Sequence, residues 1–199
     1  FAVALPLASR WYPPKYQGIA LGIAGAGNSG TVLASLFAPT LAKMFGWSSV
    51  FGLVAIPLII TFVIYQLLAK DSPDQPPAKT GAQYLGIFKQ PDAWWFMFFY
   101  GVTFGGFVGL SSSLNIYFNA EYGIDPIHAG FFTAACVFAG SLVRPVGGAL
   151  ADRIGGIRTL SVMYTVAAIA LVILSFGMPT IWTAVVVLII GMGAMGMGN

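Results

Sequence analysis

Apolar segments, each about as long as the roughly 20 residues that span a bilayer as a helix, follow one another along the whole chain. The first ends within residues 1–9, and the others cover residues 17–42, 49–69, 93–118, 129–150, 159–177 and 181–199. Only 8% of the residues are charged and 58% are hydrophobic, whereas soluble domains have about 25% charged residues. The sequence therefore predicts an all-α, polytopic membrane protein in contact with the lipid bilayer. Because the chain begins and ends within apolar segments, we interpret it as an internal piece of a longer protein.

Basic residues are distributed unevenly between alternate loops. Seven of the nine lysine and arginine residues lie in loops on one side of the predicted membrane: Arg10, Lys15, Lys70, Lys79, Lys89, Arg153 and Arg158. On the other side only Lys43 is basic, and the loop 119–128 carries Glu121 and Asp125. The positive-inside rule places the basic loops in the cytoplasm. Because the net charge of +3 is spread over such loops, we expect no nucleic-acid partner.

The longest polar stretch covers residues 70–92 and is rich in proline, lysine and aspartate. We expect it to be a cytoplasmic linker between two helical bundles. Residues 1–69 would then be the end of an N-terminal bundle, and residues 93–199 part of a C-terminal bundle. Within the linker, residues 82–90 predict a short helix at the membrane surface.

The sequence offers little for catalysis or metal binding. Cys136 is the only cysteine and His128 the only histidine, which excludes an intramolecular disulfide and a cysteine-based metal cluster. The place of His128 beside Asp125 and Pro126 favours a loop or helix-cap role. Paired carboxylates and a Ser/His/Asp set do not occur in the apolar segments, so we expect no enzyme, no cofactor and no metal site.

Arg144 is the exception to the apolar character of the segment 129–150. It lies about 12 Å along a helix from Asp152, well within a hydrocarbon layer about 30 Å thick. A charge at that depth is costly and usually faces a cavity or a partner. Since its segment has no acidic residue, the more specific interpretation is that the guanidinium binds an anionic ligand. A structural arginine bonded to backbone carbonyls is the alternative.

Two glycine-rich patterns contain an asparagine. The first runs from Gly18 to Gly30 and includes Gly25, Gly27 and Asn28, and the second includes Gly193 and Gly198 before Asn199. Glycines at such spacings bare one flank of a helix, so that a neighbour or a ligand approaches the backbone; plain helix packing is the alternative. We expect such an approach at Gly27, and we expect the Asn28 amide to have a polar partner, an anion being one candidate.

Two further patterns concern the second predicted bundle. Tyr100 and Phe104 are four residues apart, which places both rings on one helical face. They predict either core packing or an aromatic wall for a flat ligand.

The run from Gly148 through Asp152 and Arg153 to Gly155 resembles the cytoplasmic loop signature of the major facilitator superfamily. This resemblance implies that Asp152 and Arg153 make gating contacts between helices. The alternative is that they are solvated charges in a loop.

Together these motifs resemble the nitrate/nitrite porter family (NarK-type) of the major facilitator superfamily. The stretch Phe1-Ala2 to Gly18, with the glycines up to Gly30, is similar to helices 4 and 5 of that family. Tyr100-Gly101 to Gly105, Arg144-Pro145 to Gly148, and Gly193 to Asn199 are similar to helices 7, 8 and 10. The resemblance implies a fragment of a twelve-helix, monomeric transporter of the inner (plasma) membrane.

The resemblance also implies roles. Arg144 would clasp nitrate or nitrite together with a second arginine from a helix outside this chain, and Phe1, Tyr100, Phe104 and Asn28 would line the site. The glycines Gly25, Gly27, Gly30, Gly193 and Gly198 would allow helix sliding during alternating access. With no Asp or Glu deep in a segment, nitrate/nitrite exchange is favoured over proton symport. An exporter of drugs or organic anions, and a membrane sensor or scaffold without transport, remain alternatives.

Overall fold

The computed structural model describes residues 4–70 and 80–198, and these residues contain helices and turns without a strand. Five helical stretches are long and apolar enough to cross a membrane: Pro14–Phe45, Trp47–Leu68, Pro91–Tyr122, Pro126–Ile154 and Gly156–Ser175. A sixth, shorter apolar helix covers Ile181–Met197. Each of these six stretches coincides with one of the apolar segments predicted from the sequence.

Three of the long stretches are interrupted in their middle. The first consists of α2 (Gln17–Gly25), the 3₁₀ turn η2 (Ala26–Ser29) and α3 (Gly30–Phe45). The second consists of α6 (Pro91–Tyr100), the π-helical segment η4 (Gly101–Gly105) and α7 (Gly106–Tyr122). The third changes from α8 (Pro126–Leu142) to α9 (Arg144–Ile154) at Val143. Pro145, at the start of α9, has no N–H for the helical ladder, which explains the last break.

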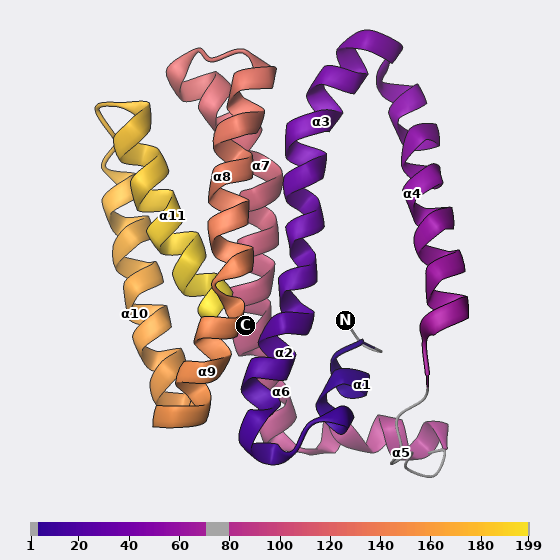
Figure 1. Ribbon diagram of the computed structural model, residues 1–199. Helices are drawn as coiled ribbons and strands as arrows, with labels where there is room; N and C mark the ends of the chain where they lie inside the picture. The colour runs from indigo at the N-terminus through magenta and orange to yellow at the C-terminus, as the bar shows by residue number, and fades with distance from the viewer. Residues whose placement is uncertain (1–3, 71–79, 199) are drawn as a thin grey trace.

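The remaining elements complete the chain in order. They are α1 (Ala4–Trp11), the 3₁₀ turn η1 (Pro14–Tyr16), α4 (Trp47–Leu68), α5 (Gly81–Leu85), the 3₁₀ turn η3 (Gly86–Lys89), α10 (Gly156–Ser175) and α11 (Ile181–Met197). Figure 1 shows α5 lying across the lower end of the upright helices. The surface helix expected at residues 82–90 therefore has a helical counterpart in α5 and η3, whose exposed apolar side chains are Tyr84, Leu85, Ile87 and Phe88.

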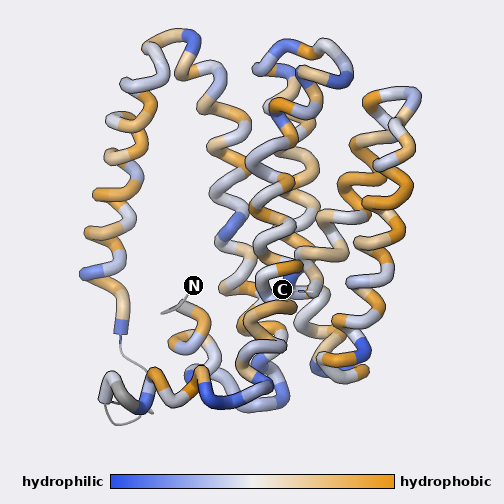
Figure 2. The backbone as a smooth tube through the Cα atoms, turned by 180° about the vertical axis from the view of Figure 1, so that it is seen from behind, coloured by the Kyte–Doolittle hydropathy of each residue, from blue (hydrophilic) through white to orange (hydrophobic). Residues whose placement is uncertain are grey.

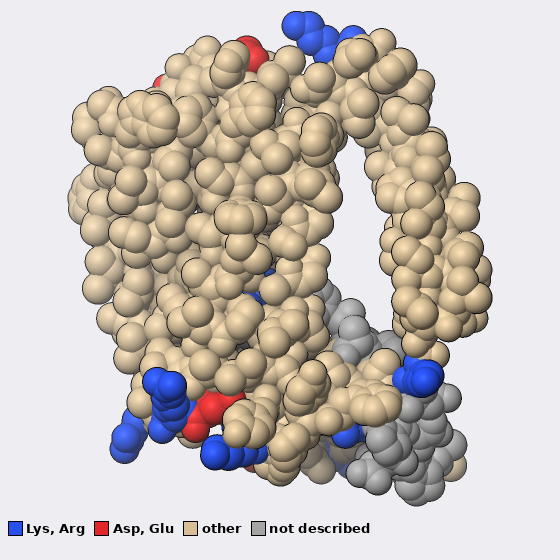
Figure 3. Space-filling model, viewed as in Figure 1, with Lys and Arg blue, Asp and Glu red and all other residues tan. Residues whose placement is uncertain are grey.

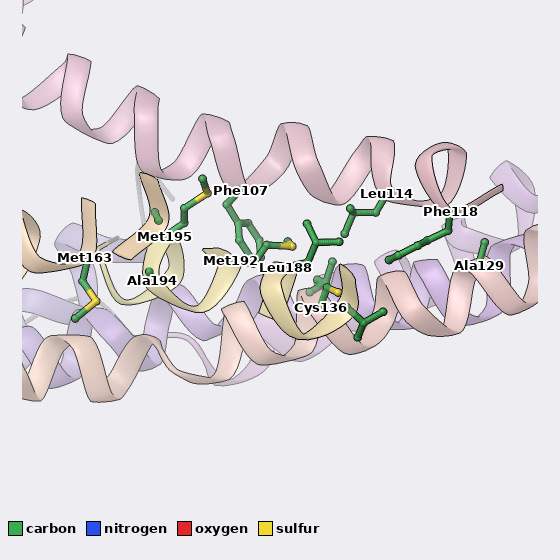
Figure 4. Close-up of a cluster of buried hydrophobic side chains, with 13 residues drawn as sticks. Phe107, Leu114, Phe118, Ala129, Cys136, Met163, Leu188, Met192, Ala194 and Met195 are labelled. Atoms are coloured by element: carbon green, nitrogen blue, oxygen red, sulfur yellow. The ribbon is translucent and has the colours of Figure 1, made fainter. Parts of the chain in front are cut away.

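The buried core lies between α7, α8 and α11. Phe107, Phe118, Cys136, Leu188 and Met192 are all at most 2% exposed and form one cluster (Figure 4). Because lipid tails are as apolar as such side chains, the helices are held by close van der Waals contact rather than by exclusion of water. The bundle therefore depends on small residues that let backbones approach.

The first interrupted stretch lies along the third, with α2 and α3 beside α9 and α8 (Figure 1). In contrast, α4 stands away from the bundle, and the space-filling view shows an opening between it and α3 (Figure 3). The side chains of α4 are almost all exposed and apolar, and Figure 2 shows hydrophobic colour along its length. Such a surface suits lipid or further membrane helices.

Charged side chains gather at the two ends of the upright helices (Figure 3). Arg10 lies in the last turn of α1, Lys89 ends η3 and Arg153 lies in the last turn of α9, all at the lower end. Lys43 lies in the last turn of α3, at the opposite end. The structure thus separates the basic loops from Lys43 as the sequence predicts; which end faces the cytoplasm stays a prediction.

Candidate functional site

Arg144 is the first residue of α9, directly after the break that follows α8. It is only 3% exposed, although Val146 on the same helix is exposed. A helix that continued from α8 without interruption would direct residue 144 differently, so the break sets the direction of the guanidinium. The sequence places the charge in the middle of the segment, and the structure buries it there.

The guanidinium is bonded to neutral groups of the first interrupted stretch. One terminal nitrogen, Nη1, donates to the backbone carbonyl of Gly25 at 3.1 Å. With the Asn28 amide oriented so that its oxygen faces the donors, Oδ1 accepts from Nη1 at 3.3 Å and from Nη2 at 3.1 Å. Among residues 4–70 and 80–198 no ion pair forms with Arg144. These contacts orient the arginine without neutralising its charge.

Two buried donors near the break have no hydrogen-bond partner in the described part of the chain. They are the Nε–H of Arg144 and the hydroxyl of Ser141, which is 0% exposed. An unpaired buried polar group costs about 1–3 kcal/mol, and more when it is charged. An anion would satisfy Nε together with the remaining guanidinium hydrogens. Ser141 was not singled out from the sequence, because a lone serine in an apolar helix has no distinctive pattern.

Aromatic rings of the second interrupted stretch cover the guanidinium. The ring of Phe107 lies 5.2 Å and that of Phe104 5.8 Å from the Arg144 Cζ atom. Tyr100 stacks on Phe104, with ring centroids 5.0 Å apart and planes inclined by 13°. The shared face expected for Tyr100 and Phe104 is therefore present. Phe107, which is 1% exposed, is an additional ring that the sequence did not indicate.

The three helix interruptions meet at Arg144. The 3₁₀ turn η2 supplies Asn28, the π-helical segment η4 supplies Phe104, and the α8–α9 break supplies the arginine itself. Irregular backbone at membrane depth is tolerated where protein or a cavity satisfies it, and in transporters it marks binding sites. π-Helical turns are likewise frequent at functional sites. The backbone irregularities and the buried charge thus point to the same place.

The glycines of α2 contact α9 at a register that differs from the expected one. An added Cβ on Gly22 would lie 2.7 Å from the Arg144 carbonyl oxygen, and one on Gly25 would lie 3.3 Å from Arg144 Cδ. A Cβ on Gly18 would lie 2.5 Å from the backbone oxygen of Gly148. No described atom lies within 4 Å of such a Cβ at Gly27. Within the described residues, no helix makes the close approach expected at Gly27; the close helix approach occurs at Gly18, Gly22 and Gly25.

The other proposed sliding glycines also divide into those that contact another helix and those that do not. A Cβ on Gly30 or Gly193 would meet no described atom within 4 Å, whereas one on Gly198 would lie 3.3 Å from Thr103 Cγ2. The tightest glycine contact joins Gly196 to the carbonyl of Gly140, between α11 and α8. Small residues thus bring these backbones together.

Of the two candidate gating residues, Asp152 joins two helices. Its carboxylate accepts hydrogen bonds from the backbone N–H groups of Gly18 at 3.1 Å and Ile19 at 3.2 Å. Both donors lie in the first turn of α2, where unpaired N–H groups and the helix dipole favour a negative charge. Arg153 is exposed. Phe1, the remaining candidate for the binding site, lies outside the described residues.

At the opposite end, Asp125 caps α8. Its carboxylate accepts from the N–H groups of Ile127 at 3.1 Å and His128 at 3.3 Å, and it contacts His128 Nδ1. The hydrogen bond from the His128 side chain, more than any other contact, holds the pKa of Asp125 below its usual value. The expected position of His128 in a helix cap is thus found, away from Arg144.

Several relatives of this chain have names that refer to nitrate or nitrite. A Mycobacterium tuberculosis protein named probable nitrate/nitrite transporter NarK2 is 34% identical over 189 residues, which are 92% of this chain and 47% of the relative. The nitrite extrusion protein of Bacillus subtilis is 30% identical over 181 residues, 91% of this chain and 46% of its own length. A probable nitrate/nitrite antiporter NarK1 of Thermus thermophilus is 32% identical over 176 residues, 80% of this chain and 39% of its own.

The chain spans about half the length of the curated relatives it matches. Their names confirm the resemblance to nitrate/nitrite porters. The Major Facilitator Superfamily matches residues 1–199, the whole sequence. Together with the five helices of membrane-spanning length, this match confirms a helical, multi-pass membrane protein. The chain belongs to the major facilitator superfamily.

Proposed function

We propose that the protein containing this chain moves nitrate or nitrite across the plasma membrane by alternating access, with the anion held by Arg144. The observation that carries the proposal is a buried guanidinium whose described partners are all neutral. Its positive charge is therefore available for an anion, in a low-dielectric interior where such an interaction is strong. The names of the relatives supply the identity of the anion.

The shape of the site suits a small planar oxyanion. The guanidinium is flat and presents its donors as a fork, which matches two oxygens of a planar anion. The stacked pair of Tyr100 and Phe104 offers a flat surface beside it. The Asn28 oxygen faces the arginine, so its NH₂ group is directed elsewhere and is a further candidate donor to the anion.

Alternating access needs contacts between bundles that separate during the cycle. We assign α2 and α3 to the N-terminal bundle and the helices from α6 onward to the C-terminal one, joined by the cytoplasmic linker 70–92. The contact of α2 with α9 through Gly18, Gly22 and Asp152 then crosses the bundle interface. Because the glycine surfaces have no interlocking side chains, they allow α2 to slide along α9. The Asp152 carboxylate, which bonds α2 to α9 at the basic end, acts as a latch: it holds the two helices together until the contact opens.

Exchange of nitrate for nitrite is the coupling that we favour. Asp92, Glu121, Asp125 and Asp152, the acidic residues in the described part of the chain, lie at or beyond the ends of the long helical stretches. A proton carrier at membrane depth is thus not supplied by these residues. The antiporter name of the Thermus thermophilus relative agrees with exchange.

The test replaces Arg144 by lysine in the full-length protein, reconstituted in liposomes and supplied with radiolabelled nitrate. Lysine keeps the charge but loses the planar fork. Losing the paired hydrogen bonds of a buried charge costs about 3 kcal/mol, so uptake is expected to fall by about two orders of magnitude. Arg158→Lys, an exposed position at the start of α10, is the matched control. Uptake by Arg144→Lys at the wild-type rate would make the arginine structural. Wild-type uptake of organic anions but not of nitrate would favour the exporter instead.

A further inference from the structure

Tyr164 of α10 reaches the second interrupted stretch through its hydroxyl group. The hydroxyl donates to the backbone carbonyl of Phe99 at 2.7 Å, and the two rings lie 5.9 Å apart, centroid to centroid. The hydrogen bond links α10 to α6 at the last turn of α6, one residue before Tyr100. It is the shortest hydrogen bond between two of the long helical stretches in the described part of the chain.

The same carbonyl has a second hydroxyl donor. Thr103, inside the π-helical segment, donates from Oγ1 to the Phe99 oxygen at 3.1 Å. Thr103 is only 3% exposed and packs against the C-terminal end of α11, where an added Cβ on the cap residue Gly198 would lie 3.3 Å from its Cγ2. Two side-chain hydroxyls from two helices therefore converge on one carbonyl, immediately before the π-helical segment begins at Gly101.

The position of this carbonyl matters because a π-helical turn is less favourable than an α-helical one and persists where other groups support it. In the π segment each N–H reaches back five residues instead of four, so one extra residue is accommodated. An extra residue rotates the helix beyond it by about 100° relative to the helix before it. The π segment thus sets the directions of Phe104, which lies within it, and of Phe107, which lies just beyond it, toward Arg144, with the rings 5.8 and 5.2 Å from its Cζ atom.

We propose that Tyr164 is a positioning residue for the anion site, and that its hydroxyl, with that of Thr103, fixes the π segment so that the Tyr100–Phe104 pair stays flat beside Arg144. This inference rests on the proposed nitrate transport and deepens it. Because the hydroxyl of Tyr164 is used by the Phe99 carbonyl, its effect on the anion is indirect. The property that it controls is the preference of the site for planar anions.

The experiment uses full-length protein with Tyr164→Phe, which removes the hydroxyl and keeps the ring. Nitrate uptake and binding are compared with those of chlorate, a pyramidal oxyanion of the same charge. We expect the KM and Kd for nitrate to rise about fivefold, the change that follows from one lost hydrogen bond. The nitrate-to-chlorate preference should fall, while the melting temperature and the maximal rate per folded molecule stay near wild type.

Two further variants accompany it. Thr103→Val removes the second hydroxyl and should reproduce the effect, whereas Thr103→Ser keeps a hydroxyl and should restore nitrate affinity; these carry the test if Tyr164→Phe does not fold. Tyr122→Phe is the matched control, because its hydroxyl also donates to a backbone carbonyl, that of Met178 at 3.2 Å, but at the other end of the bundle. It should leave the KM and the anion preference unchanged.

The outcomes separate this inference from the proposed function. If the wild-type protein binds nitrate and Tyr164→Phe has the same KM for nitrate and the same nitrate-to-chlorate preference, the positioning role alone is overturned. A lower melting temperature or maximal rate with unchanged preference would make Tyr164 a structural residue and overturn it too. Failure of wild-type protein to bind nitrate would overturn the proposed function, and the inference with it.

Discussion

Asp152 accepts a hydrogen bond at 3.1 Å from the backbone N–H of Gly18, in the first turn of a helix more than a hundred residues earlier in the chain. The contact is possible because Gly18 has no side chain: a Cβ there would lie 2.5 Å from the Asp152 carboxylate. The glycine run that begins at Gly18 and the loop signature that contains Asp152 are separate motifs in the sequence, but they form one contact in the structure. It joins α2 to α9 at the basic end.

The first prediction concerns Asp152→Asn in the full-length protein. The amide is uncharged and interacts less with the positive end of α2, so the α2–α9 contact should open more often. We expect a cysteine placed at Gln17, in a Cys136→Ala background, to react with a thiol reagent about three to ten times faster, which corresponds to roughly 1 kcal/mol. Asp125→Asn, which alters a cap within α8 itself, is the control and should leave this rate unchanged. Equal rates in wild type and Asp152→Asn would exclude the latch.

The second prediction compares two glycines on the same helical stretch. Gly22→Ala would place a Cβ 2.7 Å from the Arg144 carbonyl oxygen, whereas Gly27→Ala meets no described atom within 4 Å. Overpacking costs about 1–3 kcal/mol, so Gly22→Ala should lower the melting temperature in detergent by several degrees. Gly27→Ala should melt near wild type and transport at a normal rate per folded molecule. A large loss at Gly27 would show that another segment packs there.

The positions of the membrane helices could be predicted from the sequence because length and hydropathy are local properties. The apolar segment 129–150, for example, lies within Pro126–Ile154. The burial of Arg144 followed from the same reasoning. These inferences need no knowledge of which helices are neighbours.

What the sequence did not provide depends on contacts between helices. A run as rich in glycine as residues 18–30 is bare on more than one side, so spacing alone did not show that Gly18, Gly22 and Gly25, rather than Gly27, face α9. The 3₁₀ turn at Asn28 and the π segment before Gly106 shift the register further. Tyr164 has no local pattern at all, because its partner Phe99 belongs to another helix.

The third prediction tests the orientation in the membrane. We expect Thr80, at the basic end near α5, to face the cytoplasm, and His128, near the start of α8, to face outside. Single cysteines at these positions, in a Cys136→Ala background, are exposed to an impermeant thiol reagent added to intact cells. The cysteine at His128 should be labelled and that at Thr80 protected until the cells are opened. The reverse pattern would invert the topology.

The last prediction concerns the neutrality of the Arg144 partners. Asn28 offers an oxygen to the guanidinium at 3.1 Å from Nη2, and Asn28→Asp would keep that oxygen while adding a negative charge. The carboxylate would compete with the anion for the same donors, so nitrate binding should fall by more than two orders of magnitude, because close like charges repel strongly in a low-dielectric site. Asn28→Ala removes the hydrogen bonds without adding charge and should weaken binding only about five- to tenfold. Calorimetric titration of the full-length protein with nitrate compares the two variants. Asn119→Asp is the control for an added charge, because the Asn119 amide donates a hydrogen bond to the Ile124 carbonyl, far from Arg144. If Asn28→Asp binds nitrate as well as Asn28→Ala does, the charge of Arg144 is not what holds the anion, and the guanidinium serves to fasten α9 to α2.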